Sequence, residues 1–347
     1  LRSRPNSEQA YLIDCAAGPN ASLDVTLAAN DASGLYYAMK TFEQLLGGVA
    51  REGRVVVPTA KIIDWPDLKT RGLAALGIHL MTDENGLFDY FSGMKLNAYH
   101  YWLWMTLTPE QRFTFKKDYR KALLSAKRHN ISFIPTLLHF DYLFTKNGAL
   151  GSRLDLASKG SPDEDVEAIG NKIGRTFCYA NPGSQVMMDR MLEAAGDGSV
   201  GDRLQVWLSE GRTACNCAKC GGDKRKQFVN EIKHVMRAYR KTKRLNPNLN
   251  MIVCLSQGSY PHHYAMLDLI PKEVDIDIYA GSGPNNTYKC RLGEYFLTPQ
   301  TEEIVARGHA TGALPQLGAA LLWAAMTTPS YAPRMTKLRM SEMKDRG

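Results

Sequence analysis

A glutamate and three cysteines that follow one short apolar run are the residues of this chain best placed to do chemistry. The run Leu204-Gln-Val-Trp-Leu-Ser209 stops at Glu210 and Gly211, as expected of a buried strand that delivers an acid to the rim of a parallel sheet. At the carboxyl end of such a strand a side chain meets ligand, so Glu210 is our candidate general acid. The alternative is a glutamate that caps the next helix or pairs with a neighbouring arginine.

The cysteines after this acid are Cys215, Cys217 and Cys220, with the spacing Cys-x-Cys-x-x-Cys. Zinc takes four tetrahedral ligands, and Cys178 is the natural fourth ligand from a neighbouring loop. Ligation by thiolates alone suits a closed structural site better than a catalytic one. Two alternatives stay open: free or disulfide-bonded thiols, and a cysteine hydrolase in which Cys178 or Cys254 works with a histidine.

Aromatic and hydrogen-bonding side chains occur at the carboxyl ends of the other predicted strands. A pyranose ring offers an apolar C–H face for stacking and a rim of hydroxyls that need directed partners, and these side chains suit both. Each aromatic residue alone fits a core position as well as a ligand wall, but their shared location favours a sugar site. The candidate substrate-binding residues are His79, Trp102, Trp104, His139, Gln257, Tyr260, Tyr279 and Trp323.

Cleavage of a glycosidic bond needs more than one acid. A proton must reach the leaving oxygen, and the oxocarbenium-like centre must be stabilised by a second carboxylate or by an acetamido group of the substrate. Asp141, after the third predicted strand, is our candidate second catalytic carboxylate, with Glu294 as a weaker one. An apolar wall from Trp207 or Trp323 would raise the pKa of Glu210 by desolvation.

Short apolar runs alternate with helical periodicity from Arg71 onward, which indicates a parallel sheet with crossover helices. We expect strands at residues 73–80, 97–105, 131–140, 204–209, 250–256 and 274–279, and near 314–323. Seven strands predict a (β/α)8 TIM-type barrel over residues 71–347, incomplete at strand 8, because an open barrel would expose an edge. The competing doubly wound sheet would need a glycine-rich phosphate loop, and residues 76–81 do not form one.

Residues 1–70 predict a small α+β domain before the barrel. Two strands around a Gly-Pro-Asn turn precede a helix whose apolar face runs between residues 32 and 46, and a further strand follows. Residues 141–181 lack clear periodicity and predict an extended loop on the active face of the barrel.

Composition excludes several classes of protein. With 347 residues and 44% hydrophobic content the chain can bury a full core, and it has no apolar run long enough to span a bilayer. Its net charge of +8 comes largely from residues 111–128 and 224–244. We interpret both as solvated outer faces of barrel helices, since no aromatic platform for nucleic acid accompanies them. In the second segment Phe228, Val229, Ile232, Val235, Met236 and Tyr239 form one apolar stripe.

Four short motifs give a resemblance to known enzymes. They are Ala32-Ser-Gly-Leu-Tyr-Tyr-Ala-Met-Lys-Thr-Phe-Glu-Gln-Leu-Leu46, Val57-Pro58, Ile63-Asp64-Trp65-Pro66 and Thr70-Arg71-Gly72. In this order they resemble the second half of the non-catalytic domain that precedes the barrel in family 20 β-hexosaminidases and in α-glucuronidases. A closer resemblance spans roughly residues 32–260 and rests on Phe177 to Pro182 and Val206 to Cys220. It is to bacterial proteins of glycoside hydrolase family 163, whose fourth strand is followed by a Cys-x-Cys-x-x-Cys segment.

This resemblance implies an endo-β-N-acetylglucosaminidase that trims complex N-glycans, is secreted, periplasmic or at the cell surface, and needs no cofactor for catalysis. Family 20 enzymes carry an Asp-Glu pair at the end of strand 4, in which the aspartate orients the acetamido group and the glutamate protonates the leaving group. Here Glu210 matches the acid, but Ser209 stands where the aspartate would be. A second carboxylate is then needed from elsewhere.

Two other functions stay open. An α-glucuronidase-like enzyme would need cations at the pocket floor, for which Arg71 and Arg212 are available. A glycan-binding barrel without catalysis would explain the missing aspartate before Glu210. Because the chain begins at Leu1, we expect further sequence upstream, so the absence of a leader in this sequence indicates nothing about localisation.

Overall fold

The computed structural model describes residues 1–315, 341 and 344, apart from a set of internal gaps. These gaps are residues 48–49, 52–53, 56, 76–85, 117, 138, 146–147, 161–166, 169–170, 173–174, 202, 210–213, 256–261, 281–305 and 309–310. The chain forms two compact units. Unit 1 contains Leu1–Tyr99 and Lys121–Ser132, and unit 2 contains His100–Arg120 and Phe133–Arg346. The expected domain boundary between residues 70 and 71 falls inside unit 1 and stays a prediction.

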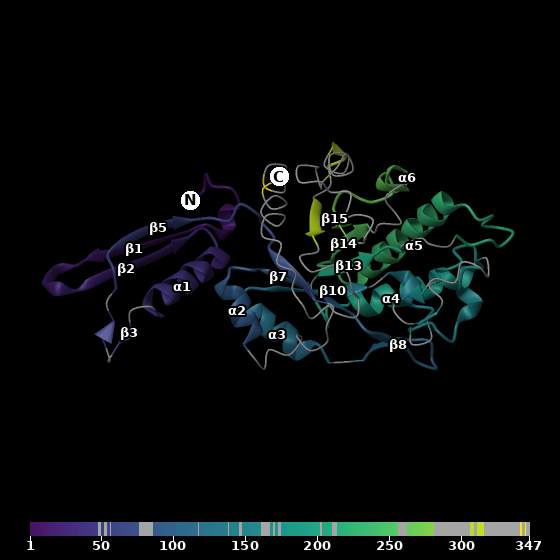
Figure 1. The fold of residues 1–347 in the computed structure, drawn as a ribbon, viewed down its shortest axis with the longest axis horizontal. Helices are drawn as coiled ribbons and strands as arrows, with labels where there is room; N and C mark the ends of the chain where they lie inside the picture. The colour runs from purple at the N-terminus through teal and green to yellow at the C-terminus, as the bar shows by residue number, and fades with distance from the viewer. Residues whose placement is uncertain are drawn as a thin grey trace. The chain divides into compact units, whose positions relative to one another are not determined.

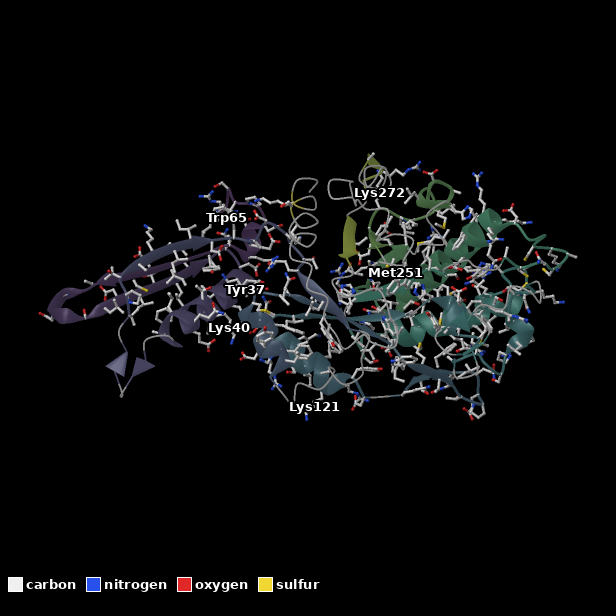
Figure 2. The ribbon with its side chains drawn as sticks, in the orientation of Figure 1. Tyr37, Lys40, Trp65, Lys121, Met251 and Lys272 are labelled. Atoms are coloured by element: carbon white, nitrogen blue, oxygen red, sulfur yellow. The ribbon has the colours of Figure 1, made fainter. Side chains whose placement is uncertain are left out.

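Unit 1 is built on a three-stranded antiparallel sheet of order β2 (Leu23–Ala29), β1 (Tyr11–Ala17) and β5 (Ala60–Asp64). Alternate residues of β1 are buried, as expected of a strand with one covered face. Figure 1 shows helix α1 (Ala32–Gly47) lying along this sheet, and its Tyr37 (Figure 2) is buried beside Tyr11 and Ile13. The two strands, the turn and the helix predicted from residues 10–46 are therefore confirmed.

A glycine at the start of α1 explains part of the glycine-led helix motif. Gly34 approaches the preceding chain so closely that a Cβ atom there would lie 2.5 Å from the carbonyl oxygen of Ala10. Unit 1 also contains several smaller elements. They are the 3₁₀ turns η1 (Ser7–Gln9) and η2 (Pro19–Ala21), the strands β3 (Ala50–Arg51) and β4 (Arg54–Val55), the helix α2 (Leu87–Gly93), and most of α3 (Arg120–Arg128).

The main sheet of the chain has seven strands in the order β16-β15-β14-β13-β10-β7-β6. The strands are β6 (Gly72–Ala75), β7 (Ala98–Trp102), β10 (Ser132–Leu137), β13 (Arg203–Trp207), β14 (Asn250–Leu255), β15 (Asp275–Ala280) and β16 (Thr311–Pro315). The pairs from β10 through β16 are parallel. The five predicted strands between residues 97 and 279 are thus confirmed, and the sheet curls into a parallel half-barrel. The first and seventh predictions overlap β6 and β16 only at residues 73–75 and 314–315, and the rest of both lies outside the described residues. Closure by an eighth strand stays a prediction.

Strand β13 is buried on both faces: Leu204 and Val206 lie on one face, and Gln205 and Trp207 on the other. Met251 of β14 (Figure 2), in register with Leu204, is buried as well. The covering helices in unit 2 are α4 (Pro182–Gly196), α5 (Lys224–Leu245) and the short α6 (His263–Leu267). Asn181 caps α4 and Asp223 caps α5, because each side chain accepts a hydrogen bond from a backbone N–H of the first turn.

The predicted apolar stripe of α5 is confirmed. Phe228, Ile232 and Val235 are buried, while nearly all the lysines and arginines of the helix are exposed. Residues 111–128, the first basic segment, were predicted to form the outer face of a helix, and this is only partly correct. Among the described residues of the segment, α3 is helical, whereas Phe113–Phe115 (β9) pairs antiparallel with Met105–Leu107 (β8) as a hairpin.

The segment between Asp141 and Asn181 is irregular, as predicted. Its described elements are η5 (Phe140–Tyr142), η6 (Leu154–Leu156) and two two-residue strands, β11 (Glu167–Ala168) and β12 (Asn171–Lys172). Among its described residues, an isolated antiparallel bridge pairs Ala157 with Phe177, and the N–H groups of Ser158 and Cys178 bond to the carbonyls of Thr176 and Leu156. Among the described helices, none is both long enough and apolar enough to cross a membrane.

Candidate functional site

The candidate site lies where β13, the fourth strand of the parallel sheet along the chain, reaches its carboxyl end. Leu208 and Ser209 follow the last residue of β13, and both are buried. Glu210, the candidate acid, is the next residue and lies outside the described part of the chain, as does Arg212. The environment of this strand end is nevertheless described through its neighbours.

A fully buried carboxylate fixes the strand end. The side chain of Glu231, from α5, accepts hydrogen bonds from the backbone N–H of Ser209 at 2.7 Å and from its hydroxyl at 2.5 Å. The Tyr179 hydroxyl donates to the same carboxylate at 2.7 Å. The Thr176 hydroxyl lies 2.9 Å from that of Ser209 and 3.4 Å from Glu231. We call these four residues the edge cluster.

Burial and hydrogen bonding act on the pKa of Glu231 in opposite directions. Burial raises it, the donors Ser209, Tyr179 and Thr176 lower it, and the net pKa lies above the ordinary value of 4.5. Burial, together with the Glu231 charge, raises the pKa of Tyr179 well above 10.0. Tyr179 therefore keeps its proton and serves as a donor.

Two predicted site residues lie at the same edge of the sheet. His139 and Asp141 follow β10, the strand next to β13, and both are buried. The ring of His139 bonds through Nδ1 to the Leu208 carbonyl at 3.1 Å and lies 4.5 Å, between ring centroids, from Trp207. The charge of Asp141 is the smallest of the contributions that raise the pKa of Tyr179.

The two predicted tryptophans lie at the end of β7. Trp102 is the last residue of that strand, and Trp104 follows two residues later. Their rings meet edge to face with centroids 6.4 Å apart, and Trp102 is only 8% exposed. Trp102 is therefore mostly covered by its neighbours, while the half-buried Trp104 is the more accessible of the pair.

Of the other predicted residues, Tyr279 and Arg71 lie in the described part of the chain. Tyr279 lies in β15, in register with Leu314 of β16. Arg71 belongs to unit 1, where its guanidinium donates to Gln9 at 2.9 Å and to the Leu68 carbonyl at 2.6 Å. The remaining predicted residues, His79, Gln257, Tyr260, Glu294 and Trp323, lie outside the described part of the chain.

The four candidate metal ligands come together. The Sγ atoms of Cys178, Cys215, Cys217 and Cys220 all lie within 4.8 Å of one another, and those of Cys178 and Cys217 are 3.8 Å apart. Three of the four cysteines are buried, and Cys217 is half-buried. Backbone N–H groups of Cys220 and Lys219 lower the pKa of Cys217 to about 6, whereas burial raises that of Cys178 to about 11.

Sequence reasoning missed Glu231, although a signal was present. It is the only acidic residue in α5 and falls within the apolar stripe, between Phe228 and Val235. A lone carboxylate on the buried face of a basic helix must find donors in the core, because an unpaired buried charge is costly. Tyr179 lies within the motif from Phe177 to Pro182 and Thr176 directly precedes it, but nothing in the sequence pairs them with Glu231.

A second polar cluster lies inside the half-barrel sheet, and we call it the interior cluster. Gln205 accepts a hydrogen bond from the Thr136 hydroxyl at 3.0 Å and donates to Asp277 at 2.7 Å. Burial raises the pKa of Asp277 to about 6. Burial and the charge of Arg203 lower the pKa of His100, which also bonds to Gln205, to about 4.

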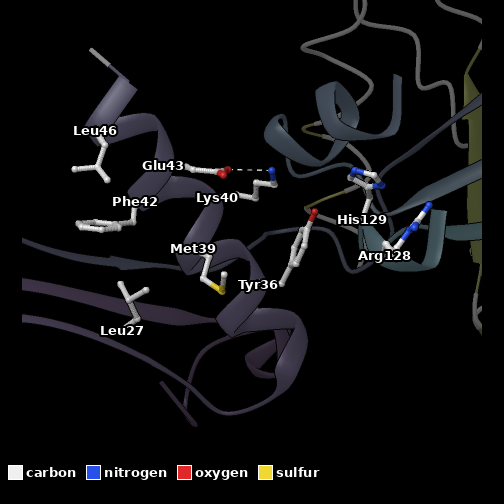
Figure 3. Close-up of a pocket in the computed structure, with 9 residues that line it drawn as sticks. All are labelled: Leu27, Tyr36, Met39, Lys40, Phe42, Glu43, Leu46, Arg128 and His129. Carbon is white, nitrogen blue, oxygen red and sulfur yellow. Dashed lines mark hydrogen bonds and ion pairs between the residues drawn. The ribbon is translucent and has the colours of Figure 1, made fainter. Parts of the chain in front are cut away.

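A pocket in unit 1 contains none of the predicted site residues. Figure 3 shows its apolar wall from α1, with Tyr36, Met39 and Phe42, and its polar side, with the Lys40–Glu43 ion pair and His129. Its volume is about 460 Å³. Among its described lining residues no catalytic arrangement is found, because the one carboxylate there, Glu43, is paired with Lys40 at 2.9 Å.

Comparisons with known proteins identify the fold. No family model matches the sequence, and no curated protein matches it. The chain is similar in structure to the N-acetyl-β-hexosaminidase of Streptomyces plicatus, with 16% identity over 96% of this chain and 65% of that one and a TM-score of 0.59. A family 20 β-N-acetylhexosaminidase of Streptomyces coelicolor has 15% identity over 96% of this chain and 66% of that one, with the same TM-score.

A glycoside hydrolase family 20 β-N-acetylglucosaminidase has 15% identity over 93% of this chain and 67% of that one, with a TM-score of 0.56. The chain therefore spans about two thirds of the length of these enzymes. Likeness at such identities establishes a shared fold, and function must be argued from the site.

Proposed function

We propose that this chain is a glycoside hydrolase of the family 20-like superfamily, built on a (β/α)8 barrel, that cleaves a β-linked N-acetylhexosamine in glycans. Glu210 is the general acid in this proposal. The observation that carries it is the fixed strand end: Glu210 directly follows Ser209, whose N–H and hydroxyl are both held by Glu231. The fold shared with family 20 enzymes supports the same assignment.

The orientation of Ser209 bears on the mechanism. Its hydroxyl is 1% exposed and is bonded to Glu231 and Thr176, so it points into the protein. Ser209 therefore cannot orient an acetamido group in the way that the aspartate of family 20 does. In the proposed mechanism Asp141, at the end of the adjacent strand, supplies the second carboxylate, and Glu210 protonates the leaving oxygen.

The substrate that we propose is more specific than the shared fold alone indicates. Following the resemblance to family 163, we propose endo action on N-glycans by a secreted, periplasmic or surface protein. His139, Trp104, Gln257, Tyr260, Tyr279 and Trp323 are proposed to line the sugar site with His79 and Trp102. The α-glucuronidase alternative loses support, because the Arg71 guanidinium is already bonded within unit 1.

A leaving-group experiment separates the two catalytic roles. Glu210→Gln should slow cleavage of a natural N-glycan by about 10²-fold to 10⁴-fold, because the alkoxide needs a proton. It should slow cleavage of the nitrophenyl glycoside of an N-glycan fragment that ends in N-acetylglucosamine much less, because a nitrophenolate leaves without one. Asp141→Asn should slow both substrates, since it acts on the sugar centre.

The matched control is Glu273→Gln, which changes an exposed carboxylate of unit 2 and should leave both rates unchanged. Equal losses on both substrates for Glu210→Gln would remove Glu210 from the acid role. If the wild-type chain binds glycans in a binding assay but cleaves none, the hydrolase proposal is wrong and the alternative of a glycan-binding barrel is favoured.

A further inference from the structure

We propose that Cys178, Cys215, Cys217 and Cys220 bind one Zn²⁺ ion in a closed structural site beside the edge cluster. The first argument is the geometry of the sulfur atoms. Tetrahedral zinc with Zn–S bonds of about 2.3 Å requires sulfur atoms about 3.8 Å apart. The Cys178 and Cys217 sulfurs are 3.8 Å apart, and all four lie within 4.8 Å of one another.

The second argument is the absence of a competing bond. A disulfide needs sulfur atoms about 2.05 Å apart, and no disulfide joins any of the six cysteines in the described part of the chain. Four converging thiols in a mostly buried position gain little from one another, because S–H groups are weak donors. A metal ion accounts for their convergence.

The third argument is the turn that presents Cys217 and Cys220. The N–H groups of Cys220 and Gly221 bond to the Cys217 carbonyl at 3.0 and 2.9 Å, which closes a tight turn. The N–H of Lys159, from the irregular segment, approaches the Cys215 sulfur at 3.4 Å. Such N–H donors orient metal-bound thiolates.

Glycine completes this turn. Gly222 has φ +73°, and a Cβ atom there would lie 2.4 Å from the Asn216 side chain. Its N–H bonds to the Cys215 carbonyl at 3.0 Å, which returns the chain beside the first cysteine of the motif. The backbone between Cys215 and Gly222 is thus shaped around the sulfur atoms.

Zinc at this position would hold together the two segments of the chain that contribute Tyr179 and Ser209 to the edge cluster. Cys178 precedes Tyr179, which bonds to Glu231, and Cys215 follows the segment that begins at Ser209. Four protein ligands leave no position for water or substrate, so the ion stabilises these loops and takes no part in the reaction. The proposal is independent of the hydrolase function.

Metal analysis of the purified chain tests the proposal. Purified protein, reconstituted with ZnCl₂ under reducing conditions and desalted, should retain about one zinc per chain. Replacement by Co²⁺ should give the intense visible bands of a tetrahedral thiolate complex. Cys217→Ser, at the half-buried ligand, should lose stoichiometric zinc, whereas Cys254→Ala, which removes a buried thiol outside the cluster, should retain it.

A wild-type measurement keeps the test decisive if Cys217→Ser fails to fold. Stepwise addition of a mercurial reagent to the zinc protein should release the metal as four thiols react, with a metallochromic dye as the readout. Folded wild-type protein that holds no zinc after reconstitution, that holds iron in its place, or that shows a disulfide within the cluster by mass spectrometry would overturn the proposal.

Discussion

The edge cluster and the interior cluster both bury charged groups in unit 2, but they are assembled differently. The interior cluster joins side chains from strands of one sheet, so its contacts follow from strand register, as for Thr136 opposite Gln205. The edge cluster joins a strand end, a helix and an irregular segment through Glu231. The hydrogen bonds of the interior cluster thus depend on the pairing of neighbouring strands, whereas those of the edge cluster depend on one central acceptor, Glu231.

Replacement of that central acceptor should have the largest effect. Glu231→Leu should lower the free energy of unfolding by about 3 to 5 kcal/mol, because the N–H and hydroxyl of Ser209 and the hydroxyl of Tyr179 lose their buried partner. Urea denaturation measures this change. Glu231→Gln keeps an amide oxygen as acceptor and is the matched variant, with a smaller expected loss. Equal stability of Glu231→Leu and wild type would show that the edge cluster does not depend on this carboxylate.

The interior cluster should respond to pH instead. The pKa of Asp277 in the folded protein, about 6, lies above its ordinary value of 3.8, so folding favours the protonated carboxyl. Its contribution is fully present below about pH 4 and is lost as pH rises through 6, by up to about 3 kcal/mol for a shift of about two pKa units. Asp277→Asn keeps the acceptor for Gln205 and should remove this loss.

The measurement is the free energy of unfolding at pH 4.5 and pH 7.5 for wild type and Asp277→Asn. The variant should gain stability relative to wild type at the higher pH. The pKa of His100 is lowered from 6.5 to about 4, so folding favours its neutral form. Its contribution to the free energy of unfolding is therefore lost as pH falls below about 6.5, whereas that of Asp277 is lost as pH rises. His100 is unchanged in both proteins, so it cancels in the comparison. A pH-independent difference would exclude the raised pKa of Asp277.

The smallest effect is expected where the sheet interior meets solvent. Arg203 donates to Asp275 at 2.6 Å, but the two side chains are 23% and 38% exposed. Arg203→Met should therefore cost only about 0 to 1 kcal/mol in urea denaturation, since water screens the pair. Lys241→Met, which breaks the ion pairs of a half-exposed α5 lysine with Asp189 and Glu193 of α4, is the matched control with a similar cost. A loss as large as that of Glu231→Leu would mean that Arg203 also holds the interior cluster together.

The sequence predicted regular elements better than the side-chain network between them. The strands and the stripe of α5 follow from local periodicity, and so does the position of Ser209 at a strand end. The Cys-x-Cys-x-x-Cys spacing with Cys178 predicted a convergence that the sulfur distances match. Glu231 was missed because its donors, Ser209 and Tyr179, lie 22 and 52 residues away in sequence. No local pattern reports such contacts, and Glu210 itself remains a prediction from position.

The inward hydroxyl of Ser209 constrains how this strand end can change. An aspartate at position 209, as in the Asp-Glu pair of family 20, would bring a second carboxylate against Glu231 in a buried position. Two like charges so close cannot both ionise, so one would retain a proton or the backbone would rotate outward. Positions 209 and 231 therefore form a coupled pair, and conversion to the family 20 arrangement requires both to be exchanged together.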